Sequence, residues 1–172
     1  GGLALGNSIG VELASNSITA KNGASISISG TGGSDASTDN HAGISAPNAT
    51  ISVEGSGDLT LTGRGGTGTD NNYGIQLQNS TLMVEDGELM LTGIAAADAT
   101  GNNNDGIALS DNSMIRSTGS GGIELVGTGG GTGTASSGGN NGIILLSGSG
   151  IEFTDLGDDR RRYRKSGHRH PR

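Results

Sequence analysis

The residues with the most evident chemical potential lie in a glycine-rich segment. Residues 63–68, Gly-Arg-Gly-Gly-Thr-Gly, match the pattern of a dinucleotide-binding turn, which requires a following helix that points its amides at a pyrophosphate. The chain continues instead into Thr69-Asp70-Asn71-Asn72. Because 35 of the 172 residues are glycine, a chance match is the better interpretation, and we expect no cofactor.

The overlapping residues 65–73 are close to the nonapeptide of calcium β-rolls, in which carboxylate and carbonyl oxygens bind the ion. Asn72 stands where that repeat requires an aliphatic residue, and no second copy follows nine residues later. A polar loop is the favoured interpretation, so no metal ligand is assigned. Weak Ca²⁺ binding remains an alternative, because five acidic residues fall in comparable loops: Asp35, Asp39, Asp70, Asp98 and Asp105.

Residues suited to catalysis are scarce. Before residue 160 the only basic side chains are Lys21, Arg64 and Arg116, the only histidine is His41, and none lies beside an acidic cluster in the sequence. Tyr73 stands alone on its loop, so there is no aromatic platform for stacking sugars. We therefore assign no catalytic residue and expect no enzyme. A fragment of a carbohydrate-active β-helix enzyme, similar to a polysaccharide lyase, is the alternative.

Charge separates the last residues from the rest of the chain. Residues 160–172 contain seven of the ten Lys and Arg and no acid, so the preceding residues hold three basic and 17 acidic side chains. An acidic body repels nucleic acid and anionic membranes, and no apolar run is long enough to span a bilayer. We expect neither nucleic acid nor membrane insertion. We interpret 160–172 as a basic, disordered tail or as residues foreign to the repeat, and a functional basic arm that binds nucleic acid or acidic surfaces is the alternative.

The small number of aromatic residues, 2% of the chain, first suggests disorder, but a repeat of about 32 residues argues against it. A glycine followed by an aliphatic residue recurs at intervals of 33, 31, 32 and 36 residues. Each period contains three short segments in which apolar and polar residues alternate, as in strands with one buried face. The periods begin at Gly10, Gly43, Gly74, Gly106 and Gly142.

Alignment of the periods places aliphatic residues in six columns, two for each strand. Three short strands per period, stacked on their counterparts at about 4.8 Å, predict an all-β, parallel β-helix over residues 1–159, right-handed by the rule for parallel crossovers. The columns are Val11, Ile44, Ile75, Ile107 and Ile143; Leu13, Ala46, Leu77, Leu109 and Leu145; Ile18, Ile51 and Leu82; Ala20, Val53 and Val84; Ile26, Leu59, Leu89 and Ile123; Ile28, Leu61, Leu91 and Leu125.

The corners of the predicted coils carry residues that tolerate a positive φ. These are Asn16, Asn48, Asn79 and Asn112 after the first strand, and Gly23, Gly57, Gly87 and Gly122 after the second. At the third corner a long polar loop, such as 62–73 or 127–141, precedes the next period. We expect these loops to stack along one edge and to form the variable exterior surface.

The fourth period departs from this pattern in its middle strand. Either Met114 or Ile115 could face inward there, and Arg116 falls in the position of Val84. We expect a bulge or a slip of register.

The motifs Gly-Ile-x-Leu, Asn-Ser-Thr-Leu-x-Val and Gly-x-Leu-x-Leu-Thr-Gly, with a Gly/Thr/Asn loop, resemble filamentous-haemagglutinin-like exoproteins and other bacterial β-strand-repeat adhesins over residues 10–156. The resemblance implies a right-handed β-helix exported across the outer membrane as a shaft or adhesive surface. The Asn-Pro-Asn motifs of that family's secretion domain are missing, so the resemblance is to the shaft.

From this resemblance we expect a non-enzymatic structural or adhesive module of a secreted or surface-exposed bacterial protein. Its expected partners are glycans or proteins of a host cell or matrix, bound through the loop edge. Neighbouring coils of a longer parent chain are the other expected contacts.

Overall fold

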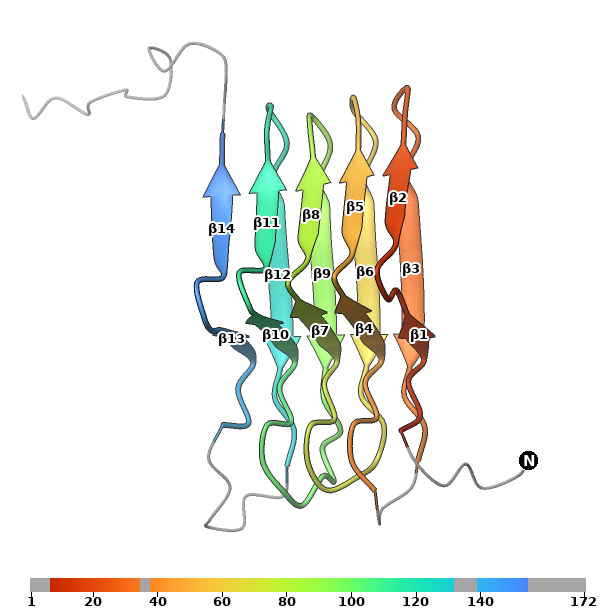
Figure 1. The fold of residues 1–172 in the computed structure, drawn as a ribbon, viewed down its shortest axis with the longest axis vertical. Helices are drawn as coiled ribbons and strands as arrows, with labels where there is room; N and C mark the ends of the chain where they lie inside the picture. The colour runs from red at the N-terminus through yellow and green to blue at the C-terminus, as the bar shows by residue number, and fades with distance from the viewer. Residues whose placement is uncertain (1–6, 35–37, 132–138, 155–172) are drawn as a thin grey trace, which may run out of the picture.

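The computed structural model describes residues 7–34, 38–131 and 139–154, and these residues form fourteen strands and no helix (Figure 1). The predicted basic tail, 160–172, lies outside the described residues. In chain order the strands are β1 (Val11–Glu12), β2 (Ser17–Ala20), β3 (Ile26–Thr31), β4 (Ile44–Pro47), β5 (Thr50–Val53), β6 (Leu59–Arg64), β7 (Ile75–Gln78), β8 (Thr81–Val84), β9 (Leu89–Ile94), β10 (Ile107–Ser110), β11 (Met114–Ser117), β12 (Ile123–Thr128), β13 (Ile143–Leu145) and β14 (Gly150–Phe153).

The strands form three parallel sheets, each built from one strand of every coil. Their orders are β1-β4-β7-β10-β13, β2-β5-β8-β11-β14 and β3-β6-β9-β12. In Figure 1 the chain rises along β2 in front, descends along β3 behind it, and advances from right to left, which is a right-handed path. The predicted parallel β-helix with three strands per coil is therefore confirmed.

The core is a narrow set of aliphatic ladders, and the predicted columns are confirmed by the strand register. Ile51, for example, pairs with Leu82, and Leu61 pairs with Leu91. Each buried Leu or Ile side chain contributes about 1.5–3 kcal/mol, so the stacked columns replace the aromatic core that this composition cannot supply. The largest fully buried side chains are Ile44, Ile51, Leu59, Leu61, Ile75, Leu77, Leu82, Leu89, Leu91, Ile107, Leu109 and Ile115.

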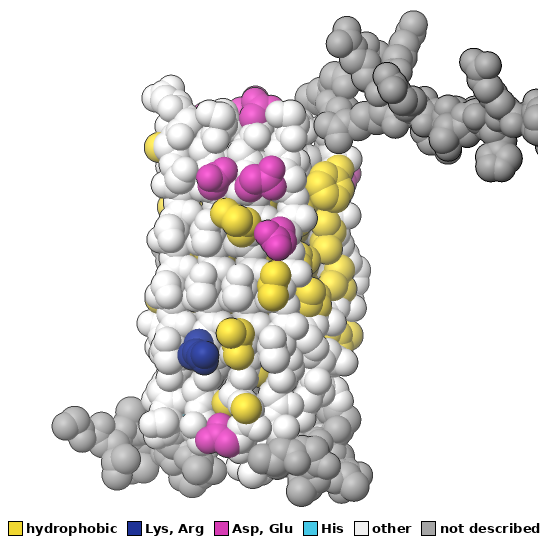
Figure 2. Space-filling model, turned by 180° about the vertical axis from the view of Figure 1, so that it is seen from behind, with side chains coloured by type: hydrophobic (Ala, Val, Ile, Leu, Met, Phe, Trp, Pro, Cys, Tyr) yellow, Lys and Arg dark blue, Asp and Glu magenta, His cyan; other side chains and the backbone are white. Residues whose placement is uncertain are grey.

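Burial decreases toward the two ends of the described stack. Val11 and Ile26 in the first coil are only partly buried against the core. In the last coil the large hydrophobic side chains are exposed, and Phe153 reaches 63% exposure. Yellow side chains accordingly follow the edge beside the C-terminal coil in Figure 2. The three central coils therefore hold most of the buried apolar surface.

The expected bulge in the fourth coil is absent, and the prediction was wrong. Strand β11 pairs with β8 residue for residue, so that Ile115 lies opposite Leu82 and Ser117 lies opposite Val84. Ser117 is fully buried, and its hydroxyl donates a hydrogen bond of 2.6 Å to a carbonyl oxygen four residues later. Arg116 faces outward instead of occupying the Val84 position.

The register is preserved because the corner before β11 holds one extra residue. Asp111 and Asn112, with φ values of 54° and 65°, both adopt the left-handed conformation there. In the third coil the same corner has a single such residue, Asn79, at 48°. The additional residue absorbs the one-position offset, so the strand that follows enters the sheet in phase.

The corner predictions are partly confirmed. Asn48, Asn79 and Asn112 have positive φ, but in the first coil Ser15, at 52°, adopts this conformation rather than Asn16. Asn16 lies one residue later and corresponds to Ala49 of the second coil. The carbonyl oxygen of each residue accepts the first backbone amide of the middle strand in the next coil. Asn and Ser both tolerate the left-handed conformation through local side-chain bonds, so the two residue types cannot be distinguished by the pattern alone.

The position after these corner residues carries a serine ladder that the sequence analysis did not find. The backbone amide of Ala49 donates to the Ser80 hydroxyl at 2.8 Å, and the Ser80 amide donates to the Ser113 hydroxyl at 3.1 Å. The Ser113 amide donates in turn to the Ser149 hydroxyl at 3.1 Å. These bonds satisfy amides that are buried where the chain turns between the first and second walls.

The glycines of the second corner are required mainly by close packing. Gly23 has a φ of 75°, as predicted, but Gly57 and Gly87 do not have a positive φ. A Cβ atom at Gly57 would lie 2.2 Å from a carbonyl oxygen of the coil before it, and one at Gly87 would lie 1.9 Å from the Gly57 oxygen. In the fourth coil the equivalent residue is Gly121 rather than Gly122, because its Cβ would meet the Gly87 oxygen at 1.9 Å.

None of the described segments forms a helix that is long and apolar enough to cross a membrane.

Candidate functional site

The loops that carry the candidate site leave and rejoin the coils at a contact between two glycine columns. A Cβ atom at Gly63 would lie 2.0 Å from the Gly74 carbonyl oxygen, and one at Gly74 would lie 2.3 Å from the Ile94 backbone nitrogen. The end of each third strand therefore touches the start of the next coil backbone to backbone. This contact closes the aliphatic core and separates it from the loops.

The loops begin later than predicted, because the strands of the third wall are six residues long. Strand β6 continues through Arg64 and β12 through Thr128, whereas the predicted loops began at Thr62 and Gly127. The loop segments are 32–43, 65–74, 95–106 and 129–142, of which 35–37 and 132–138 lie outside the described residues.

A ladder of polar side chains runs through the interior of the loop edge, two residues before each period-initial glycine. The His41 backbone amide donates to Oδ1 of Asn72 at 3.1 Å. The backbone and side-chain amides of Asn72 both donate to Oδ1 of Asn104, at 3.0 and 2.9 Å. The Asn104 backbone amide donates to Oδ1 of Asn140 at 2.9 Å. We call these four residues the loop ladder.

Three of the four residues of the loop ladder are buried, and successive members hydrogen-bond to one another. His41, Asn72 and Asn104 have no exposed surface. The Asn104 side-chain amide also donates to the carbonyl oxygens of Thr69 and Gly101, both at 3.1 Å. Buried polar groups with partners of this kind make a loop rigid, because breaking one bond leaves a desolvated donor or acceptor. Sequence reasoning missed the ladder, although its constant offset from the glycine column was the available signal.

His41 occupies the loop ladder as a structural residue. Its Nδ1 accepts the Ser8 backbone amide at 3.2 Å, so in the neutral ring Nε2 carries the proton and donates to the Thr38 hydroxyl oxygen at 2.8 Å. The bond of Nδ1 thus joins the first two coils, and the bond of Nε2 braces the loop that carries His41.

The acidic residues of the loop edge are dispersed among bonds between coils. Asp39 accepts hydrogen bonds from the Thr69 hydroxyl and from the Asp70 amide, which hold the pKa of the Asp39 carboxyl below its usual value. Asp70 in turn accepts the Asn102 amide, and Asp98 is exposed. Asp35 lies outside the described residues. Across the described ranges, no three acidic or histidine side chains converge in a way that could hold a metal ion.

Asp105 is the most buried of the described carboxyls at this edge, with 3% of its surface exposed. Its Oδ1 accepts the backbone amide of Asn141 at 2.6 Å and the Asn141 side-chain amide at 3.0 Å. Burial raises the pKa of Asp105, and these two hydrogen bonds oppose the rise only in part. Tyr73 lies nearby, and burial followed by the Asp105 charge raises the pKa of its phenol.

The three described basic side chains differ in their partners. Lys21 Nζ lies 3.2 Å from Glu54 Oε1, and Arg116 Nε lies 3.0 Å from Glu152 Oε2. Within the part of the chain that the structure describes, Arg64 makes no ion pair. It is exposed at the end of β6, where the third wall meets the loops.

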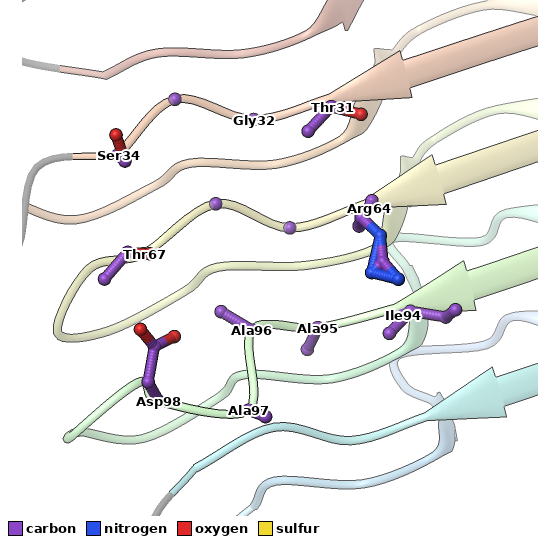
Figure 3. Close-up of a pocket in the computed structure, with 13 residues that line it drawn as sticks. Thr31, Gly32, Ser34, Arg64, Thr67, Ile94, Ala95, Ala96, Ala97 and Asp98 are labelled. Carbon is purple, nitrogen blue, oxygen red and sulfur yellow. The ribbon is translucent and has the colours of Figure 1, made fainter.

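Beside Arg64 the exterior is hollowed into an open groove of about 530 Å³ that crosses three coils (Figure 3). The side chains on the floor of the groove are small, because the residues that directly follow β3, β6 and β9 are glycine or alanine. In Figure 3 the Arg64 side chain extends from the end of β6 toward Ile94, and the Asp98 carboxylate points toward the loop that carries Thr67. The lining residues are Thr31–Ser34, Arg64–Thr67 and Ile94–Asp98.

The segment that matched the dinucleotide pattern runs through this groove as the end of a strand and the start of a loop. The Gly65 amide donates to the Ile94 oxygen and the Gly66 amide to the His41 oxygen, both at 2.7 Å. These amides are therefore used between coils and do not point at an open phosphate position.

Comparison with protein families, characterised proteins and solved structures found no match for this chain, so its functional interpretation depends on the residues and geometry above.

Proposed function

We propose that this chain is a non-enzymatic structural or adhesive module of a secreted or surface-exposed bacterial repeat protein. In this proposal the stacked coils form a stiff shaft, and the loop edge makes contact with glycans or proteins of a host cell or matrix. Neighbouring coils of a longer parent chain would extend the shaft in the same parallel register.

The observation that carries the proposal is the loop ladder. It fixes each loop to the next at the coil spacing of about 4.8 Å, through side chains of which His41, Asn72 and Asn104 are fully buried. The exterior side chains of the loops, such as Asp98 and Asn102, are consequently free to differ without disturbing the core. A rigid support with independent surface residues is an arrangement suited to recognition rather than to turnover.

The experiment compares binding of the wild-type chain and two variants to cultured cells and immobilised glycans. In the first variant the loops 65–74 and 95–106 are exchanged for short Gly-Asn turns. The second retains the loop ladder and replaces three loop residues outside it, the half-buried Thr67 and the exposed Asp98 and Asn102, through Thr67→Ala, Asp98→Ala and Asn102→Ala. Circular dichroism verifies the β content of both variants. We expect both to lose binding, and unchanged binding by the second, folded variant contradicts the proposal.

A turnover assay separates this proposal from a carbohydrate-active enzyme. Acidic and neutral polysaccharides incubated with the chain should yield no new reducing ends and no unsaturated products above the buffer control. Release of either product in proportion to protein concentration would reject the non-enzymatic assignment.

A further inference from the structure

Arg64 differs from Lys21 and Arg116, the other described basic residues, in the residues that lie beside it in the neighbouring coils. Strand pairing places Glu152 directly opposite Arg116, and Glu54 of the second coil lies within ion-pair distance of Lys21 of the first. Arg64 is instead opposite Thr31 on one side and Ile94 on the other. Among the described residues, neither neighbouring coil places a carboxylate within ion-pair distance of Arg64.

The groove beside Arg64 has room for a ligand that would supply this carboxylate. Its volume of about 530 Å³ is in the range of small-ligand sites, and hydroxyls of Thr31, Ser34 and Thr67 line it. Asp98 provides a hydrogen-bond acceptor on the third coil, and Ile94 provides an apolar surface (Figure 3). On the face shown in Figure 2, basic colour is confined to one patch, whereas acidic side chains recur across it.

From these observations we propose that the groove binds a carboxylate-bearing sugar unit, with Arg64 holding the carboxylate and Asp98 accepting hydrogen bonds from sugar hydroxyls. A guanidinium forms two parallel hydrogen bonds with a carboxylate, which orients the ligand. Asp98 and the acidic body repel a phosphate group, with its larger charge, more strongly than a single carboxylate. The inference rests on the proposed function, since it names the ligand class of the loop edge.

The test measures binding by calorimetry at about 0.15 M ionic strength, where exposed charges are screened beyond about 8 Å, with two probes that have the same sugar backbone. One is a hexamer of galacturonic acid, and the other is its fully methyl-esterified form, which lacks the charge. We expect the acid to bind and the ester to bind at least about tenfold more weakly, the change for one lost hydrogen-bonded charge. Arg64→Gln should raise the dissociation constant for the acid by a similar factor.

Arg116→Gln is the matched control, because it removes the same charge from another wall, remote from the groove. It should leave the dissociation constant within about twofold, since Arg116 is paired with Glu152 and a distant charge is largely screened. Equal binding of acid and ester, equal losses in Arg64→Gln and Arg116→Gln, or no binding of the acid at millimolar concentration would each overturn the proposal. In all three cases the loop-exchange experiment on cells and glycans can still succeed, so the two proposals fail separately.

Discussion

Oδ1 of Asn104 accepts two hydrogen bonds from Asn72 of the preceding coil, one from the backbone amide at 3.0 Å and one from the side chain at 2.9 Å. A single buried oxygen thus satisfies two donors that have no access to water. The serine ladder at the opposite corner uses the same principle, because a side-chain oxygen of one coil accepts an amide of the coil before it. Polar side chains therefore replace strand pairing where the chain leaves the sheets.

Asn104→Leu tests this relationship. The variant leaves the backbone and side-chain amides of Asn72 without an acceptor, and each buried, unsatisfied donor costs about 1–3 kcal/mol. We expect the free energy of unfolding, measured with urea, to fall by at least about 2 kcal/mol. Asn102→Ala is the control, because this neighbouring residue is exposed and only its backbone amide contacts Asp70. Equal losses in both variants would show that the loop ladder contributes little.

His41→Asn tests whether the histidine is an interchangeable member of the loop ladder. An asparagine oxygen can accept the Ser8 amide in place of Nδ1, as the asparagines of the later coils accept theirs. We expect the free energy of unfolding of His41→Asn to lie within about 1 kcal/mol of the wild-type value. In His41→Ala, which has no acceptor, the free energy of unfolding should fall by about 1–3 kcal/mol. Urea unfolding measures both values. A variant with Asn that is as unstable as the one with Ala would indicate a specific need for the imidazole.

Asp105 gives the stability of the loop edge a defined dependence on pH. Its folded pKa is raised above the unfolded value, so the folded chain retains the proton over a pH window in which the unfolded chain has released it. Within that window stability decreases as pH rises, and above it the ionised, buried carboxylate is a constant penalty. Below the unfolded pKa the group is protonated in both states and contributes no such penalty.

Asp105→Asn removes this penalty and retains Oδ1 as the acceptor for Asn141. We expect the variant to have a higher melting temperature than the wild type at pH 7, with the difference disappearing as pH falls below the usual range of an aspartic acid. The comparison cancels the contributions of other carboxyls, including Asp39, whose lowered pKa acts in the opposite direction. A melting temperature difference that is the same at pH 3 and pH 7 contradicts the assignment.

The parts of the fold that follow from apolar periodicity could be predicted, because only one register buries a whole strand face. Ile44, Ile75 and Ile107 align at a constant offset from glycine and indeed pair in one sheet. The loop ladder shows the same constant offset from glycine, but its burial could not be predicted, since a buried asparagine and a solvated one are identical letters in a polar loop. The lack of an acidic residue directly opposite Arg64 could have been predicted, because the same alignment places Arg64 between Thr31 and Ile94.

The prediction for the corner before β11 was wrong for a related reason. A polar residue inserted in a corner does not interrupt the alternation of apolar and polar residues, so the alternation does not show where the insertion lies. Deletion of Asn112 tests the structural account. The corner then resembles that of the third coil, where one residue suffices, and β11 should still pair with β8 in the observed register. We expect the variant to fold, with an unfolding free energy lowered by no more than about 1–2 kcal/mol, the cost of rearranging one turn position.

The contrasting variant deletes Arg116 within β11. Ser117 is the last residue of β11, so this deletion moves it from the inward position opposite Val84 to the outward position opposite Met83. We expect the loss of stability to exceed that of the Asn112 deletion, since the Gly121 carbonyl oxygen loses the buried Ser117 hydroxyl that donates to it. Urea unfolding with circular dichroism measures both. If the two deletions were equally damaging, the extra corner residue would not be what keeps the fourth coil in phase.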